Sequence, residues 1–187
     1  MIITGKYPQL RLRRNRYNQW SRKLITENNL SVNDLIMPIF IIDGKNKKIP
    51  VRTMPGVFRY SLDRLNSVVQ SAIYLGIPMV AIFPYTKGIL KNPLGTESLN
   101  PNNLVCRACK QIKKKFKNKI GIMCDVALDP YTSHGHDGVF LKGDVDNDET
   151  IKILSEQALI QASAGCDVLA PSDMMDGRIG VIRKKLD

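Results

Sequence analysis

The sequence predicts an α/β fold in which parallel strands alternate with helices. Three observations lead to this prediction. Short apolar runs of strand length recur along the chain, segments of helical periodicity separate them, and glycines stand where two of these helices should end. A strand, a helix and a further parallel strand form a right-handed crossover, so repeated units of this kind build one parallel sheet.

The first strand is expected over 35–42, a continuous apolar run typical of a strand buried on both faces. Pro38 lies within this run and indicates a strand end or an edge. A helix is expected over 62–75, because its apolar residues keep helical spacing. Ser61 is the expected N-cap of this helix, and Gly76 stands where it should end.

The rest of the chain repeats this alternation of apolar strand and helix. The remaining elements are expected at 77–83 (strand), 102–116 (helix), 119–126 (strand), 148–164 (helix), 167–170 (strand) and 177–186 (helix). Asp148, beside the acidic Glu149, is the expected N-cap of the helix over 148–164, and Gly165 follows its end.

Two parallel architectures compete for this pattern. A doubly wound sheet usually carries a glycine-rich turn after its first strand, and residues 42–48 have none. A (β/α)8 TIM barrel places its chemistry at the carboxyl ends of its strands. The third strand runs into Asp125 and the fourth into Ser172, which favours the barrel. A complete barrel needs about 250 residues, so we expect 31–187 to form only the amino-terminal half of one, about four β/α units.

Composition places the chain among globular proteins and excludes a disordered, collagen-like or coiled-coil chain. Hydrophobic residues make up 43% and charged residues 24% of the 187 residues. No apolar run reaches the length of a membrane span, and the amino terminus has no signal-peptide core, so we expect a cytoplasmic protein. The four cysteines are then expected to be free thiols.

The formal net charge of +11 comes partly from residues 1–30, which we expect to form an extended amino-terminal arm, and partly from lysines over 110–119. Such charge is typical of proteins that bind nucleic acid, but a solvated arm and helix face explain it equally well. Only Tyr17 and Trp20 place aromatic rings among the basic residues of 11–23, so we favour the solvated surface and do not expect a nucleic-acid partner.

The segment from Asp125 to Asp137 holds three carboxylates and both histidines of the chain. Carboxylates clustered after a strand can bind a hard cation, receive an ammonium group, or raise one another's pKa for acid–base chemistry. His134 and His136 have a spacing that could ligate a transition metal. A solvated loop whose side chains cap turns is the alternative, and composition alone does not decide between these possibilities.

Together with several further motifs, this segment resembles the porphobilinogen synthase (5-aminolevulinate dehydratase) family over residues 11–187. The motifs that carry the resemblance, in order, lie at 11–14, 35–40, 54–57, 125, 131–136, 145–148 and 170–177. The resemblance implies a TIM barrel whose arm wraps a neighbour in a homo-octamer. It also implies a lyase that condenses two 5-aminolevulinate molecules to porphobilinogen, with loss of water, in tetrapyrrole and heme biosynthesis.

The resemblance assigns roles to four residues of this chain. Asp125 matches the catalytic aspartate beside the substrate amine, Asp129 and Asp137 would hold the ammonium of one substrate, and Ser172 lies near the first substrate site. Zinc-dependent members carry three cysteines where this sequence has Ala127, Asp129 and Asp137. Because zinc favours sulfur and nitrogen ligands, we expect no catalytic zinc and no metal ligand here. The pattern instead resembles the aspartate-rich members of the family, which work without catalytic zinc and often respond to magnesium.

The resemblance also implies two lysines that form Schiff bases with the substrate ketone. Both belong to later strands, and Lys184 and Lys185 do not match them. We therefore expect the chain as given to be inactive alone. The alternative from a different functional class is a non-catalytic truncated product, or a basic module that binds RNA or protein.

Overall fold

The computed structural model describes residues 5–141 and 143–187. They divide into two compact units, one of residues up to Asp34 and one of Leu35–Asp187. The first unit contains the 3-10 helices η1 (Arg14–Arg16) and η2 (Val32–Asp34) and the short helix α1 (Gln19–Leu24). The sequence predicted an extended arm over 1–30; its first four residues lie outside the described part, and the rest includes η1 and α1.

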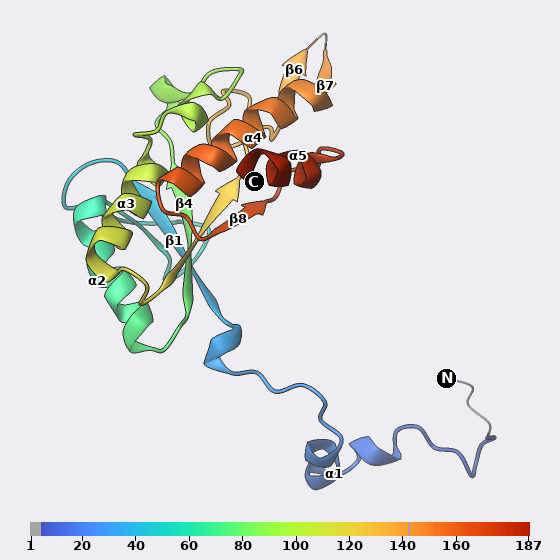
Figure 1. The fold of residues 1–187 in the computed structure, drawn as a ribbon. Coiled ribbons are helices and arrows are strands. Elements are labelled where there is room, and N and C mark those ends of the chain that lie inside the picture. The colour runs from blue at the N-terminus through green and yellow to red at the C-terminus, as the bar shows by residue number, and fades with distance from the viewer. Residues whose placement is uncertain (1–4, 142) are drawn as a thin grey trace. The chain divides into compact units, whose positions relative to one another are not determined.

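The second unit is built on a six-stranded sheet (Figure 1). Its order is β2-β3-β1-β4-β5-β8. The strands are β1 (Ile36–Ile42), β2 (Lys48–Pro50), β3 (Phe58–Tyr60), β4 (Met79–Tyr85), β5 (Gly121–Val126) and β8 (Val168–Pro171). Only the pairing of β2 with β3 is antiparallel.

Strands β1, β4, β5 and β8 lie side by side in chain order and all run parallel. Each new strand is therefore added at the same edge of the sheet, whereas a doubly wound sheet reverses its order at a switch point. Winding in one direction is the arrangement of a (β/α)8 barrel. The predicted fold class, the first part of such a barrel, is confirmed.

Helices connect these strands and cover one face of the sheet. They are α2 (Leu62–Tyr74), α3 (Leu104–Phe116), α4 (Asn147–Ser163) and α5 (Arg178–Leu186), with short 3-10 helices η3 (Gly88–Leu90) and η4 (Thr96–Leu99) in the connection from β4 to α3. Within the described ranges, none of the helices is long and apolar enough to span a membrane.

The main core lies between the sheet and helices α2 and α3. Ile39, Val80 and Ile122 project from three adjacent strands into this core and are almost fully buried. Because successive side chains of a strand point to opposite faces, Phe40, Phe83 and Asp125 point to the other face. A second core lies beneath α4 and α5. All four cysteines are free thiols, as predicted.

Pro38 lies in the middle of β1, where the sequence led us to expect a strand end or an edge. β1 pairs with β4 along its full length but with β3 only at Phe40 and Ile41. At Pro38, therefore, β1 has no paired residue on β3. The lack of a backbone N–H at this proline thus breaks no pairing with β3.

Two expected helix caps are wrong in detail. Ser61 occupies the N-cap position of α2, but its hydroxyl accepts a hydrogen bond from the Lys47 backbone N–H instead of capping the helix. Helix α4 begins one residue earlier than predicted, and Asp146, not Asp148, caps it by accepting a hydrogen bond from the Glu149 N–H at 2.9 Å. The backbone of Asp146 has the extended conformation that is typical of an N-cap residue.

The sequence did not predict β2, β3 or the hairpin of β6 (Val139–Leu141) and β7 (Asp144–Asp146). Each of these strands has three residues, too few to show a hydrophobic period. The hairpin lies between the expected strand over 119–126 and the expected helix over 148–164, where no element was predicted.

The capping assignment predicts different costs for two neighbouring substitutions. Asp146→Ala should lower the free energy of unfolding by about 1 kcal/mol, since it leaves a helical N–H without its partner. Asp148→Ala should cost less, because it removes only a first-turn charge and a contact with Asn147. Urea denaturation of the two variants measures both values, and an equal or larger loss in Asp148→Ala would contradict the assignment.

Candidate functional site

The carboxyl ends of β5 and β8 bring two of the expected site residues into contact. Asp125 is paired with Ala170 in the sheet register, and Ser172 follows β8 directly. The Ser172 hydroxyl donates a hydrogen bond to Asp125 Oδ1 at 2.6 Å. A bond this short to a carboxylate is typical of a charge-assisted hydrogen bond, and it fixes the orientation of the Asp125 side chain.

The carboxylates of Asp125, Asp129 and Asp137 lie close enough to influence one another's ionisation. Burial raises the pKa of Asp125, the Ser172 hydrogen bond opposes that rise, and the charges of Asp137 and Asp173 add to it. Burial also raises the pKa of Asp129, together with the charges of Asp137 and Asp125, to about 6. The structure thus brings all four expected site residues into one region.

A cavity of about 300 Å³ opens beside Asp125 and Asp129. Its lining combines these two carboxylates with two cationic side chains and several aromatic or proline rings: Phe40, Arg59, Phe83, Pro84, Tyr85, Lys91 and Pro130. A carboxylate-lined cavity of this size can receive a small ligand that carries an ammonium group.

Arg59 and Lys91 belong to this cavity but were not among the expected site residues. The Arg59 guanidinium lies over the Tyr85 ring, 4.7 Å from its centre, and Lys91 Nζ donates to the Asp129 backbone carbonyl at 3.3 Å. The Lys91 charge opposes the rise in the pKa of Asp129. Lys91 lies in the segment after the second predicted strand, and this position was the signal by which the sequence could have indicated it as a site residue. Arg59 belongs to a strand too short to predict.

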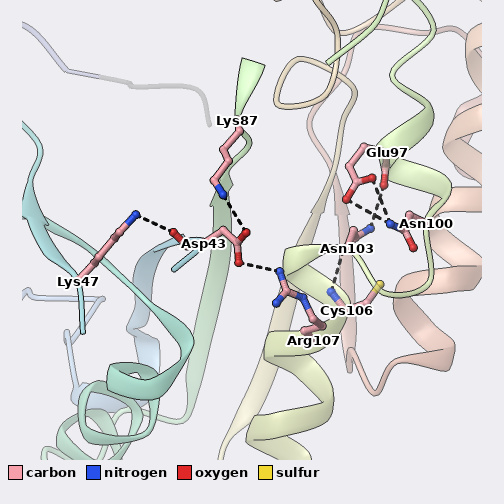
Figure 2. Close-up of polar contacts among 8 residues, drawn as sticks. All are labelled: Asp43, Lys47, Lys87, Glu97, Asn100, Asn103, Cys106 and Arg107. Carbon is pink, nitrogen blue, oxygen red and sulfur yellow. Dashed lines mark hydrogen bonds and ion pairs between the residues drawn. The ribbon is translucent and has the colours of Figure 1, made fainter. Parts of the chain in front are cut away.

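Asp43, which directly follows β1, is a third residue that was not among the expected site residues. Figure 2 shows Lys87 and Arg107 pointing at its carboxylate, at 3.2 and 3.1 Å, while Lys47 donates to its backbone carbonyl. The hydrogen bond from Arg107, more than that from Lys87, keeps the pKa of Asp43 below its usual value. These contacts join the segments that follow β1 and β4 to helix α3.

The segment after β4 is in turn attached to the segment that carries the carboxylates. Asn92 forms an isolated parallel bridge with Thr132, and its backbone carbonyl accepts from the Ser133 N–H at 3.1 Å. Lys91 is therefore fixed beside Asp129 through its neighbour in the chain. Backbone hydrogen bonds, more than exposed ion pairs, set this part of the site.

The two histidines do not form a metal site. His134 Nε2 lies 3.2 Å from the Pro93 carbonyl, and the rings of His134 and His136 both pack edge-on against Phe140. Throughout 5–141 and 143–187, no three His, Cys, Asp or Glu side chains are arranged to hold a metal ion. The histidines thus contribute to the structure of the turn before β6.

The residues at the positions expected for zinc ligands do not suit zinc. Ala127 is buried and offers only a methyl group, while Asp129 and Asp137 offer carboxylate oxygens. Zinc sites in proteins draw mainly on thiolate sulfur and imidazole nitrogen. Catalytic zinc therefore does not fit this set of side chains.

The interaction among the carboxylates predicts the outcome of a substitution. Asp137→Asn should lower the pKa of Asp129 from about 6 toward its ordinary value, since the variant removes a neighbouring negative charge. Carbon-13 NMR titration of the Asp129 carboxyl group measures this change. Asp144→Asn, in the hairpin strand β7, should leave it unaltered, and an Asp129 pKa that is the same in all three proteins would contradict the proximity of the carboxylates.

Comparison with known proteins identifies what the chain resembles. The family model for delta-aminolevulinic acid dehydratase matches residues 9–187. Proteins of that name from Bradyrhizobium diazoefficiens and Chlamydia pneumoniae are 53% and 46% identical to this chain, over 178 and 177 residues. Each alignment covers 95% of this chain but only 50% and 53% of the relative.

A solved structure of similar fold is the Toxoplasma gondii delta-aminolevulinic acid dehydratase (porphobilinogen synthase), in complex with its reaction product porphobilinogen. It matches with a TM-score of 0.88 and 42% identity over 96% of this chain and 51% of that chain. The chain thus spans about half the length of the relatives that it matches.

Proposed function

The chain belongs to the delta-aminolevulinic acid dehydratase family, and we propose that it supplies the residues that bind and deprotonate one substrate amine when two 5-aminolevulinate molecules condense to porphobilinogen. The observation that carries this proposal is the Asp125–Ser172 contact beside a cavity lined by carboxylates. The product named for the Toxoplasma gondii structure supports the choice of reaction.

The carboxylates fit the chemistry of the substrate amine. An aminoketone binds as its ammonium form, and Asp129 and Asp137 offer two negative charges to hold it. The amine becomes nucleophilic only after it loses a proton, and Asp125 is the proposed acceptor. Its burial raises its pKa, which brings a carboxylate closer to the range in which it exchanges protons efficiently near neutral pH.

Ser172 leaves part of the Asp125 carboxylate free for this role. The serine hydroxyl donates to Oδ1, so Oδ2 remains the oxygen available to the substrate proton. The lysines that would form Schiff bases match no residue of this chain. The proposal for this chain therefore covers binding and deprotonation of one amine and leaves out activation of the ketone.

We further propose that residues up to Asp34 dock on a second copy of the protein, as the resemblance to homo-octameric enzymes implies. Several large apolar side chains of this unit are exposed, which supports such a contact: Tyr17, Trp20, Leu24 and Leu30 are 85%, 68%, 79% and 83% exposed. Burial of these side chains against a neighbouring copy would be favourable.

Magnesium, not zinc, is the metal we propose for any metal dependence of this protein. The supporting observation is that the positions at which zinc-dependent members carry cysteines hold Ala127, Asp129 and Asp137, which offer no thiolate. Hard oxygen donors suit magnesium, whereas thiolates select zinc. No step of the proposed amine chemistry passes through the metal.

Turnover tests the proposed role of Asp125. The natural protein, purified from its own cells, should form porphobilinogen from 5-aminolevulinate, and Asp125→Asn should lower the rate by roughly 10² to 10⁴. Glu156→Gln, which removes an exposed carboxylate paired with Lys185 on α5, is the matched control and should retain full activity. Undiminished turnover in Asp125→Asn would contradict the role, and porphobilinogen formed by these 187 residues alone would contradict the assignment of the lysines to later strands.

Chelation tests the absence of catalytic zinc. The zinc chelator 1,10-phenanthroline should leave the turnover of the natural protein unchanged, because the positions of the zinc ligands hold an alanine and two aspartates. The non-chelating isomer 1,7-phenanthroline controls for effects unrelated to metal. Loss of activity with the chelator alone, followed by recovery on addition of zinc, would contradict the proposal.

A further inference from the structure

Helix α4 presents two buried glutamines to the backbone of the segment that carries the site. Gln157 and Gln161 are each only 1% exposed. The Gln161 side-chain nitrogen donates to the Asp125 backbone carbonyl at 2.9 Å. The Gln157 nitrogen donates to the Ala127 carbonyl at 3.1 Å. The two amides therefore hold alternate residues of one extended segment.

The spacing of helix and strand makes this double contact possible. Residues four apart in a helix are separated by about 6 Å along its axis, and residues two apart in a strand by about 6.6 Å. The later glutamine pairs with the earlier carbonyl. Helix α4 thus runs antiparallel to the strand, as a β/α unit requires, and the two amides meet the two carbonyls in register.

Packing alone does not account for these side chains. A leucine fills a buried position without burying polar atoms, whereas a buried amide must find partners for its nitrogen and its oxygen. Both side-chain oxygens, Gln157 Oε1 and Gln161 Oε1, have no protein hydrogen-bond partner among the described residues. The polar contacts of these two amides are therefore the bonds from their nitrogens to the two carbonyls.

The anchored carbonyls lie where the sheet ceases to hold β5 on one side. The pairing of β4 with β5 ends at Cys124, one residue before Asp125, while the pairing with β8 continues through Asp125 to Val126. Gln161 therefore holds the backbone at the first residue that lacks a paired partner on β4. Ser172 holds the side chain of the same residue.

From this geometry we propose that Gln157 and Gln161 are positioning residues for Asp125, which fix the backbone that aims its carboxylate at the cavity. The proposal rests on the proposed function, which assigns Asp125 as the group that accepts the substrate proton. The glutamines are buried and do not line the cavity; they act through the two carbonyls that flank Val126.

The test replaces one amide with an apolar side chain of similar shape. Gln161→Met keeps the unbranched chain but cannot donate to the Asp125 carbonyl. The control, Gln111→Met, removes a side-chain amide that donates to the Leu62 carbonyl at 2.7 Å, between α3 and α2. Gln111→Met also loses a hydrogen bond to Asn66 Oδ1 at 3.2 Å, so the control removes at least as many amide hydrogen bonds, but only Gln161→Met removes one at Asp125.

We expect the Asp125 carboxyl carbon, titrated by NMR, to show a lower pKa in Gln161→Met than in the unaltered protein, because a loosened carboxylate gains contact with water. The groups that act on Asp125 from neighbouring segments, Ser172, Asp137 and Asp173, are the same in every variant. In a protein that forms porphobilinogen, Gln161→Met should also lower kcat about tenfold, with KM changed less. Gln111→Met should alter neither quantity.

An unchanged Asp125 pKa in Gln161→Met, or the same change in Gln111→Met, would overturn the proposal. The titration needs no turnover, so it separates failure of this inference from failure of the proposed function. If Gln161→Met does not fold, a measurement on the unaltered protein tests the proposal instead. A scalar coupling across the hydrogen bond, from the Gln161 side-chain nitrogen to the Asp125 carbonyl carbon, supports the proposal, and its absence overturns it.

Discussion

The parallel pairing of β5 with β8 is the constraint on which the rest of the site depends. It aligns Asp125 with Ala170, so that Ser172, which follows β8 directly, reaches the Asp125 carboxylate. A slip of one residue would turn Asp125 toward the core and expose Cys124 instead. Because the core side of β5 is filled by Ile122 and Cys124, the apolar packing of the sheet fixes the direction of the carboxylate.

The apolar core does not reach the segments beyond the strand ends, so polar contacts hold these segments in place. Asp43 connects Lys87 and Arg107, the Asn92 bridge attaches the next segment to Thr132, and the amide of Gln161 fixes the backbone at Asp125. Such contacts keep several negative charges close together. Burial, together with the neighbouring carboxylates, raises the pKa of Asp125 and of Asp129, as expected for groups that exchange protons with a ligand.

The sequence predicted the elements that have a clear period. The buried strands could be recognised from continuous apolar runs, and Asp125 could be placed at a strand end because such a run stops there. The hydroxyl of Ser61 and the choice between Asp146 and Asp148 could not be predicted, because each depends on which N–H lies nearby in three dimensions. Arg59 reaches the cavity through a strand of three residues paired with β1, a contact that no local pattern reveals.

The central claim is that the carboxylates of Asp125, Asp129 and Asp137 receive the amine of 5-aminolevulinate. The most direct test adds 5-aminolevulinate to the protein while the carboxyl carbons of Asp125 and Asp129 are followed by NMR. We predict a saturable shift of both resonances that levulinate, which has the same ketone and carboxylate but no amine, does not reproduce. The absence of any shift, or equal shifts with levulinate, would contradict the claim.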